Sequence, residues 1–99
     1  MLDELEAFLR RYAGLAVVVV WEDDHAPGTE MDRLLRDIER FGRVPVFRLA
    51  LADCRDWAQA HGIYGSPALV VYYRSRPLFR LIGRATPAEL LQRLRDCGL

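Results

Sequence analysis

The stretch that decides the fold is residues 15–29, which read L-A-V-V-V-V-W-E-D-D-H-A-P-G-T. The run from Leu15 to Trp21 is apolar and rich in β-branched residues without polar alternation, which is typical of a strand covered by helices on both faces. The polar residues after it end in a Pro and a Gly, where a helix can begin. The sequence therefore predicts a central strand that turns directly into a helix.

Helical periodicity marks a segment on each side of this strand. Apolar residues recur with helical spacing in residues 2–12, where acidic side chains come early and arginines come late, as the helix dipole favours. A second apolar stripe covers residues 31–41, in a helix that we expect to begin near Ala26 or Pro27 and to end at Gly42. Each helix can cover one face of the central strand.

The middle of the chain predicts a second strand and a short third helix. Val44 to Leu51 has the composition of a strand, and Pro45 and Arg48 favour a position at the edge of the sheet. Asp53 is placed to cap a helix over residues 54–61.

The last third of the chain predicts a hairpin and a final helix. The apolar runs 68–73 and 78–82 are separated by R-S-R-P, which indicates a loop of about four residues. Thr86, Pro87 and Glu89 have the residue types of an N-cap, a first-turn proline and a capping-box acid. The apolar face of the final helix is expected to consist of Leu90, Leu91, Leu94 and Cys97.

Length and composition fit one soluble α/β domain over residues 1–99, with 52% hydrophobic and 28% charged residues. The 14 basic residues balance the 14 acidic ones, so we expect neither a nucleic acid nor a membrane as partner. The N-terminal segment is acidic where a signal peptide would be basic, and the longest apolar run is too short to span a bilayer. We therefore expect a cytoplasmic location.

The order of these elements, together with two motifs, resembles thioredoxin over nearly the whole chain. W-E-D-D-H-A-P-G-T follows the central strand, and Y-G-S-P-A-L-V-V-Y-Y precedes the hairpin. Trp21 matches the first Trp of the thioredoxin motif F-W-A-x-W-C-G-P-C, and residues 25–28 fall on C-G-P-C. Ser66 and Pro67 match the cis peptide of the family, and Gly83 matches the Gly that precedes its last helix.

The resemblance implies a thioredoxin-like α/β fold with a four-stranded mixed sheet and helices on both faces. The extra N-terminal strand of thioredoxin has no counterpart here, which leaves the strand with Pro45 and Arg48 at an open edge. Such an edge can pair with a second copy in a weak homodimer, although its proline and arginine oppose this.

The dithiol chemistry of the resembled family is not expected at this turn. Dithiol exchange needs a thiolate at a helix N-terminus and a second thiol one turn later, and His25, Ala26, Pro27 and Gly28 provide neither. Val19 stands where the family has a buried acid. We therefore expect no dithiol–disulfide oxidoreductase activity, no enzymatic function and no cofactor.

In the resembled family, the same turn borders a groove where an extended segment of a partner pairs with backbone groups, and this binding does not require thiols. The binding groove implied for this chain consists of Trp21, His25, Ala26, Pro27, Ser66, Pro67, Gly83 and Arg84. The alternative is that Pro67 and Gly83 are present only because the backbone needs them.

His25 and the two cysteines leave further alternatives open. Next to two aspartates, His25 has the chemistry to titrate near neutral pH or to bind a metal, but a solvated turn histidine is the simpler explanation, and we expect no metal site.

Cys97 is expected in the core. Cys54 is expected in the first turn of a helix beside Arg55, a setting that favours the thiolate. The alternative for Cys54 is a small residue without a redox role.

Two functions follow. The first is a redox-inactive protein-binding module, an adaptor, chaperone-like protein or assembly factor that takes a protein or an extended peptide as its partner. The resemblance gives it precedents in bacterial relatives without C-x-x-C, including hydrogenase-maturation and chaperone-type thioredoxin relatives. The alternative is a single-thiol redox enzyme or sensor that acts through Cys54. Because the third and fourth helices are expected on opposite faces of the sheet, Cys54 and Cys97 should not pair.

Overall fold

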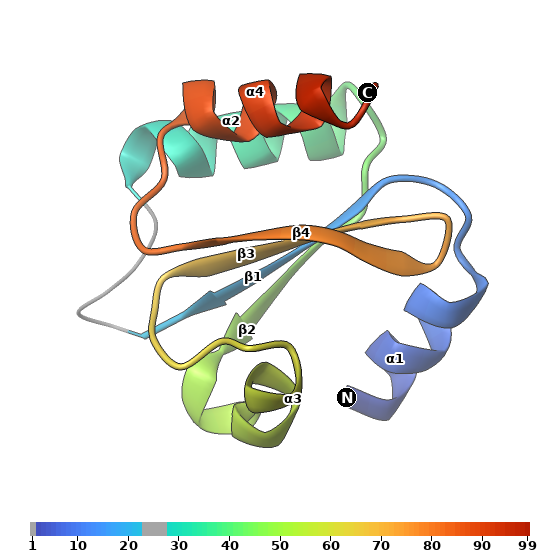
Figure 1. The fold of residues 1–99 in the computed structure, drawn as a ribbon, viewed down its shortest axis with the longest axis vertical. Helices are drawn as coiled ribbons and strands as arrows, with labels where there is room; N and C mark the ends of the chain where they lie inside the picture. The colour runs from blue at the N-terminus through green and yellow to red at the C-terminus, as the bar shows by residue number, and fades with distance from the viewer. Residues whose placement is uncertain (1, 23–27) are drawn as a thin grey trace.

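The computed structural model describes residues 2–22 and 28–99. Figure 1 shows a sheet between two layers of helices, as predicted. The helices are α1 (Leu2–Arg11), α2 (Thr29–Arg40), the short 3-10 helix η1 (Leu51–Asp53), α3 (Arg55–Ala60) and α4 (Pro87–Asp96). The strands are β1 (Ala16–Trp21), β2 (Val46–Ala50), β3 (Ala68–Tyr73) and β4 (Arg76–Ile82).

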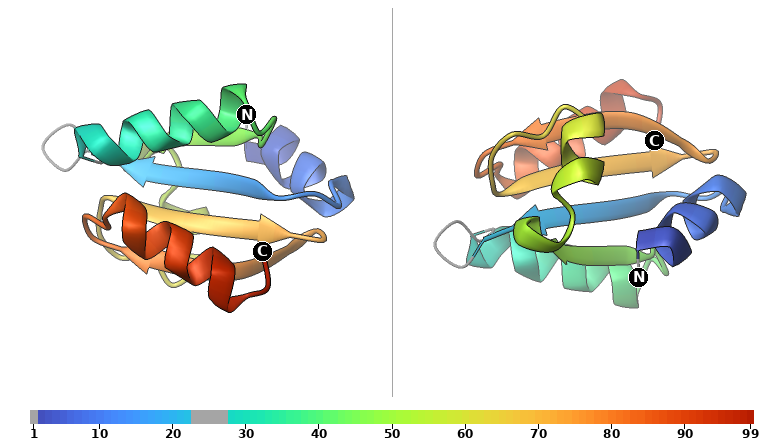
Figure 2. Two further views of the ribbon diagram at one scale, coloured as in Figure 1. Left: turned by 90° about the horizontal axis from the view of Figure 1, so that it is seen from above. Right: turned by 90° about the horizontal axis from the view of Figure 1, so that it is seen from below.

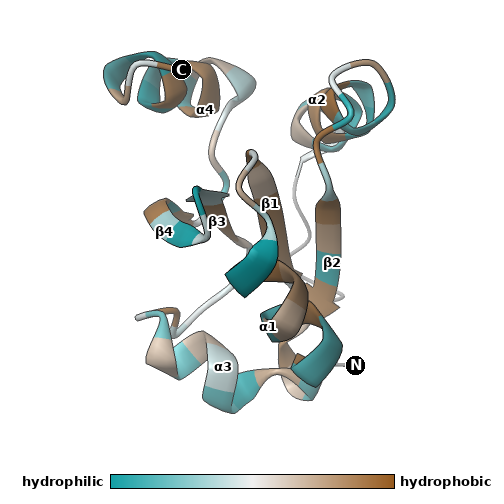
Figure 3. Cartoon of the chain, turned by 90° about the vertical axis from the view of Figure 1, so that its right-hand side faces the viewer, coloured by the Kyte–Doolittle hydropathy of each residue, from teal (hydrophilic) through white to brown (hydrophobic). Residues whose placement is uncertain are grey.

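The described strands form one mixed sheet in the order β2-β1-β3-β4. β2 pairs with β1 in parallel, and the other two pairings are antiparallel. The expectation that the strand with Pro45 and Arg48 lies at an edge is confirmed. Figure 3 shows β2 at the margin of the sheet, with α2 beyond one face and α1 beyond the other.

The side chains of β1 alternate between two cores. Val18 and Val20 contribute to the core under α1 and α3, and Val17 and Val19 contribute to the core under α2 and α4. Figure 2 shows these helix pairs on opposite faces of the sheet. Since burying one such side chain contributes about 1.5–3 kcal/mol, the unbroken apolar run of β1 stabilises both layers at once.

α2 begins at Thr29, with Gly28 in an extended conformation at the N-cap. The start that the sequence suggested is therefore two or three residues too early, and Ala26 and Pro27 lie outside the described residues. The apolar stripe is confirmed at Met31 and Leu35, which are buried against the sheet, but it does not extend to residue 41, because Phe41 is 75% exposed beyond the end of α2.

The hairpin differs from its prediction. Its loop has two residues, Arg74 and Ser75, with φ of 55° and 65°, and Arg76 already pairs with Tyr73. The predicted four-residue loop was wrong because β4 is an edge strand, in which Pro77 is tolerated. The turn is held from outside, since the Ser75 Oγ donates a hydrogen bond of 3.0 Å to the Tyr12 carbonyl.

The N-cap of α4 is confirmed at Thr86, whereas the apolar face of this helix is narrower than predicted. Thr86 Oγ1 accepts a hydrogen bond of 3.2 Å from the Glu89 amide. Leu90 is buried, but Leu91 is exposed. Cys97 is also exposed, which corrects its predicted place in the core: α4 ends at Asp96, so Cys97 lies just beyond the face that meets the sheet.

Within the described part of the chain, no helix has the length and hydropathy that a membrane span requires.

Candidate functional site

Those residues of the implied binding groove that the structure describes gather at one end of the sheet. β1 ends at Trp21, which lies opposite the last residue of β2. β3 begins directly after Pro67, and the Gly83 amide at the end of β4 donates a 2.8 Å hydrogen bond to the Pro67 carbonyl. The Ser66–Pro67 peptide bond is cis. Trp21, the loop at Ser66 and Pro67, and Gly83 therefore follow one another across neighbouring strands.

Pro67, Gly83 and Arg84 line one small hollow, which also includes Met31 of α2. Its volume is about 10 Å³, roughly the space of one water. Gly83 has a φ of +86°, which disfavours any larger residue at this position. This part of the site is a closely packed surface on which a ligand can lie, and it has no room for a side chain.

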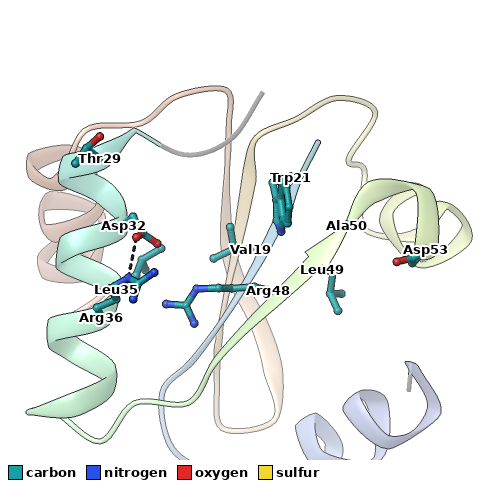
Figure 4. A pocket seen from close by; sticks show the side chains of 10 residues that line it. All are labelled: Val19, Trp21, Thr29, Asp32, Leu35, Arg36, Arg48, Leu49, Ala50 and Asp53. Carbon is teal, nitrogen blue, oxygen red and sulfur yellow. Dashed lines mark hydrogen bonds and ion pairs between the residues drawn. The ribbon is translucent and has the colours of Figure 1, made fainter. Parts of the chain in front are cut away.

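Trp21 opens onto a second and much larger hollow, which we call the α2–β2 groove. Its volume is about 580 Å³, a size typical of ligand sites. The lining residues, shown in Figure 4, are Val19, Trp21, Thr29, Asp32, Leu35, Arg36, Arg48, Leu49, Ala50 and Asp53. The first turns of α2 separate the two hollows, because Met31 lines the small one while Thr29 and Asp32 line the groove.

Ion pairs compensate most of the charge along the groove. Arg36 donates a 2.8 Å hydrogen bond to Asp32, and this bond raises the pKa of the arginine. Arg48, whose side chain extends from β2 toward α2 in Figure 4, pairs with Glu39 at 3.3 Å. The apolar side chains of Val19, Trp21, Leu35 and Leu49 also line the groove, so it offers surface for apolar contacts.

The groove exists because the sheet ends at β2. α2 packs on β1 and extends over the margin, where the described chain adds no further strand to support it. The sequence did not predict this groove. Two features of the sequence could have indicated it. Pro45 and Arg48 favour an edge strand, and the pairing of Asp32 with Arg36 one helical turn apart indicates an exposed helix face.

His25, Ala26 and Pro27 lie outside the described residues, so their part in the predicted groove stays a prediction. Among residues 2–22 and 28–99, no three His, Cys, Asp or Glu side chains lie close enough together to hold a metal ion.

Cys54 does not have the thiolate-favouring setting that the neighbouring Arg55 suggested. It occupies the N-cap of α3 and is only 2% exposed, in the core with Trp57. Its Sγ donates a hydrogen bond to the Ala50 carbonyl at 3.3 Å. Burial raises the pKa of the thiol, Asp53 adds to the rise, and Arg55 only partly opposes it. The prediction was wrong because η1 turns Cys54 inward.

No protein-family model matches this sequence, and no curated protein does. Solved structures do match. Thioredoxin NaTrxh from Nicotiana alata superposes with a TM-score of 0.76 at 17% identity, covering 96% of this chain and 83% of its own. Mitochondrial thioredoxin 3 from Saccharomyces cerevisiae superposes with a TM-score of 0.76 at 19% identity. The match covers 96% of this chain and 89% of the yeast protein. The chain has a thioredoxin fold.

A third match comes from a structural study of the thiol resolving mechanism in yeast mitochondrial 1-Cys peroxiredoxin via glutathione/thioredoxin systems. It has a TM-score of 0.76 at 18% identity and covers 97% of this chain and 90% of its own. At these identities the likeness establishes the shared thioredoxin fold, whose four-stranded sheet and helix layers agree with those described above.

Proposed function

We propose that this thioredoxin-fold protein is a protein-binding module without redox activity. It would hold an extended segment of a partner at the end of the sheet formed by Trp21, Ser66, Pro67 and Gly83. One observation carries the proposal. The end of the sheet at Trp21 combines an apolar groove with a closely packed surface.

The positions of the two cysteines support the absence of dithiol chemistry. Cys54 is buried under α1 and α3, and Cys97 lies beyond the end of α4. Val19, which replaces the acid of the resembled family, is packed in the core beside Leu35 and cannot transfer a proton. The geometry of Cys54 also argues against the alternative of a single-thiol enzyme or sensor, because a buried thiol with a raised pKa reacts poorly.

An extended segment suits this end of the sheet. Main-chain hydrogen bonds at strand ends supply affinity, and an apolar hollow beside them accepts alternate side chains. Trp21 offers a large and half-buried apolar surface next to the loop at Ser66 and Pro67. An adaptor, a chaperone-like protein or an assembly factor would use such a surface, and the partner would be a protein or an extended peptide.

Fluorescence anisotropy with labelled, reduced and carboxymethylated α-lactalbumin tests the proposal, because this probe is unfolded and has no free thiol. Trp21→Ala should weaken binding at least tenfold, on the order of the effect of an interface hot spot. The matched control is Phe41→Ala, which removes an aromatic side chain that is 75% exposed just beyond the C-terminal end of α2 and should leave binding unchanged.

The double variant Cys54→Ser/Cys97→Ser should bind as the wild type does. If Trp21→Ala binds equally well, or if binding disappears with the cysteines, the proposal is wrong.

A further inference from the structure

The outer edge of β2 has unpaired backbone groups. The Val17 amide donates to the Pro45 carbonyl at 2.9 Å. Because successive residues of a strand point their backbone groups to opposite sides, Val46, Arg48 and Ala50 must direct theirs away from β1. Among the described residues, β2 has β1 as its only strand neighbour.

One of these outward groups is already occupied. The Ala50 carbonyl accepts the hydrogen bond of the Cys54 thiol. Within residues 2–22 and 28–99, the amides of Val46, Arg48 and Ala50 and the carbonyls of Val46 and Arg48 have no strand partner and are left for another strand.

Hollows lie on both sides of this edge. The α2–β2 groove, of about 580 Å³, lies on the α2 side. A second hollow of about 500 Å³, which we call the α1 hollow, is lined by Leu2 and Asp3 of α1 together with Leu49 and Asp53. Leu49 and Asp53 line both hollows, so the two meet at the edge of β2.

An added strand would place its side chains alternately on the two faces of the sheet, and hence alternately in the two hollows. We infer that the open edge of β2 binds an extended segment of a partner protein, of about five residues, as a fifth strand. Apolar side chains of the segment enter the α2–β2 groove, and Lys or Arg side chains face Asp3 and Asp53. This inference goes beyond the proposed function: both use the α2–β2 groove, but the inference adds the backbone edge of β2, which the proposed function does not use.

The charges that line the two hollows indicate which side chains of the segment each hollow would take. In the groove, both arginines are already paired with carboxylates of α2, so an apolar side chain suits it best. Asp3 and Asp53 are exposed, and neither is in an ion pair with another described residue. Basic side chains in the α1 hollow would therefore gain two uncompensated partners.

A second copy of this chain fits the edge poorly. Antiparallel pairing of two β2 strands with full overlap sets Arg48 directly opposite Arg48 of the other copy, and like charges in such a pair are destabilising. The other edge of the sheet suits a basic segment no better, because Arg76 and Arg80 of β4 are exposed there.

Amide hydrogen exchange of the ¹⁵N-labelled protein with the peptide Lys-Val-Lys-Leu-Lys-Val-Lys tests the inference. Exchange should slow at Val46, Arg48 and Ala50, whereas Phe47 and Leu49, which already point to β1, should change little. The reordered peptide Lys-Lys-Lys-Lys-Val-Leu-Val has the same composition without alternation, and Glu-Val-Glu-Leu-Glu-Val-Glu reverses the charge. Both should bind roughly tenfold more weakly or worse.

Two matched substitutions separate the backbone from the side chain. Arg48→Pro removes an outward amide without breaking the β1 ladder, and Arg48→Ala removes the same ion pair but keeps the amide. Arg48→Pro should bind the alternating peptide roughly tenfold more weakly than Arg48→Ala. Asp3→Asn/Asp53→Asn should weaken binding and reduce its dependence on salt. If Arg48→Pro does not fold, the exchange pattern of the wild type decides.

Protection that does not alternate along β2, equal binding of the reordered peptide, or protection of β2 without peptide at rising protein concentration would each overturn the inference. Protection confined to the residues around Ser66 and Gly83 would also overturn it, but would leave the proposed function intact. Loss of α-lactalbumin binding in Trp21→Ala with alternating protection of β2 in the wild type would support both.

Discussion

Cys54 and Cys97 have opposite environments, although both are free thiols. Cys54 is buried and hydrogen-bonded to the Ala50 carbonyl, and Cys97 is exposed after the last turn of α4. In the native protein, an aromatic disulfide reagent should therefore modify Cys97 at least tenfold faster than Cys54, roughly as accessibility and thiolate fraction dictate. A stopped-flow thiol titration of Cys54→Ser and Cys97→Ser measures each rate, and a fast phase that survives in Cys97→Ser would contradict this.

His61 and Tyr72 form a polar contact at the margin of the core under α1 and α3. The Tyr72 hydroxyl and the His61 Nε2 are hydrogen-bonded, and the His61 Nδ1 lies 2.9 Å from the Trp57 carbonyl. Since a carbonyl can only accept, Nδ1 carries the proton, and in the neutral ring Nε2 accepts from the tyrosine. The ring also stacks on Trp57, with centroids 4.1 Å apart.

The burial of Tyr72 gives stability a specific dependence on alkaline pH. Burial, and to a lesser degree Glu6, raises the pKa of Tyr72 to about 12, above the roughly 10 of an unfolded tyrosine. The neutral hydroxyl is thus favoured in the folded state. The stability that the neutral Tyr72 hydroxyl contributes to the folded state is complete below about pH 10 and is lost as the pH rises toward 12.

Urea unfolding between pH 7 and 11.5 measures this effect. Tyr72→Phe should lower the free energy of unfolding by about 1 kcal/mol at pH 7, and the difference from the wild type should shrink above pH 10. Tyr64→Phe is the control, because Tyr64 is 80% exposed. A difference that stays constant to pH 11.5 would contradict the assignment.

At the scale of elements, the hairpin turn has two non-glycine residues in the left-handed region. Arg74 has a φ of 55°, and its guanidinium lies 5.3 Å from the ring centroid of Tyr73. Two-residue hairpin turns with positive φ at both positions strongly favour Asn and Gly. Arg74→Asn should therefore raise the free energy of unfolding by about 0.5 kcal/mol.

The neighbouring position supplies the contrast. Ser75→Gly also relieves the backbone but removes the hydrogen bond from Ser75 Oγ to the Tyr12 carbonyl, so it should stabilise less than Arg74→Asn. Urea unfolding of both variants decides, and destabilisation by Arg74→Asn would show that the ring contact with Tyr73 outweighs the backbone preference.

The N-terminus of α4 depends on one side chain. Thr86 Oγ1 accepts from the Glu89 amide at 3.2 Å and donates to its carboxylate at 3.3 Å. Thr86→Ala should lower the free energy of unfolding by about 1 kcal/mol, as measured by thermal or urea unfolding. Thr86→Ser retains the hydroxyl and should restore most of it, and equal losses in the two variants would argue that the methyl group, not the cap, matters.

These elements show where local sequence suffices. The N-cap of α4 was predictable because Thr86 and the Glu89 amide that it accepts from lie within four residues, and the edge position of β2 was predictable from Pro45 and Arg48. The inward turn of Cys54 was not, because it depends on η1. The two-residue hairpin turn was not predicted either. Arg74 and Ser75 are unfavourable residues for its positive φ angles, and the turn is stabilised by contacts with the loop after α1, such as Ser75 with Tyr12.

At the scale of the whole molecule, the fold was largely predictable, because four landmarks appear in order along one chain. They are Trp21 after the central strand, the loop at Ser66 and Pro67, Gly83, and the capped last helix. The α2–β2 groove was not predictable in the same way. The groove depends on how α2 packs over the edge strand β2, and this packing between elements cannot be read from local sequence.

We propose that this thioredoxin-fold protein binds a partner and does not exchange disulfides. Insulin reduction by dithiothreitol, followed by turbidity, tests this most directly with the wild type, Cys54→Ser and Cys97→Ser. We expect the same rate of insulin reduction with all three proteins as with dithiothreitol alone. An acceleration by the wild type that disappears in Cys54→Ser would contradict it and make the buried thiol the centre of an enzyme.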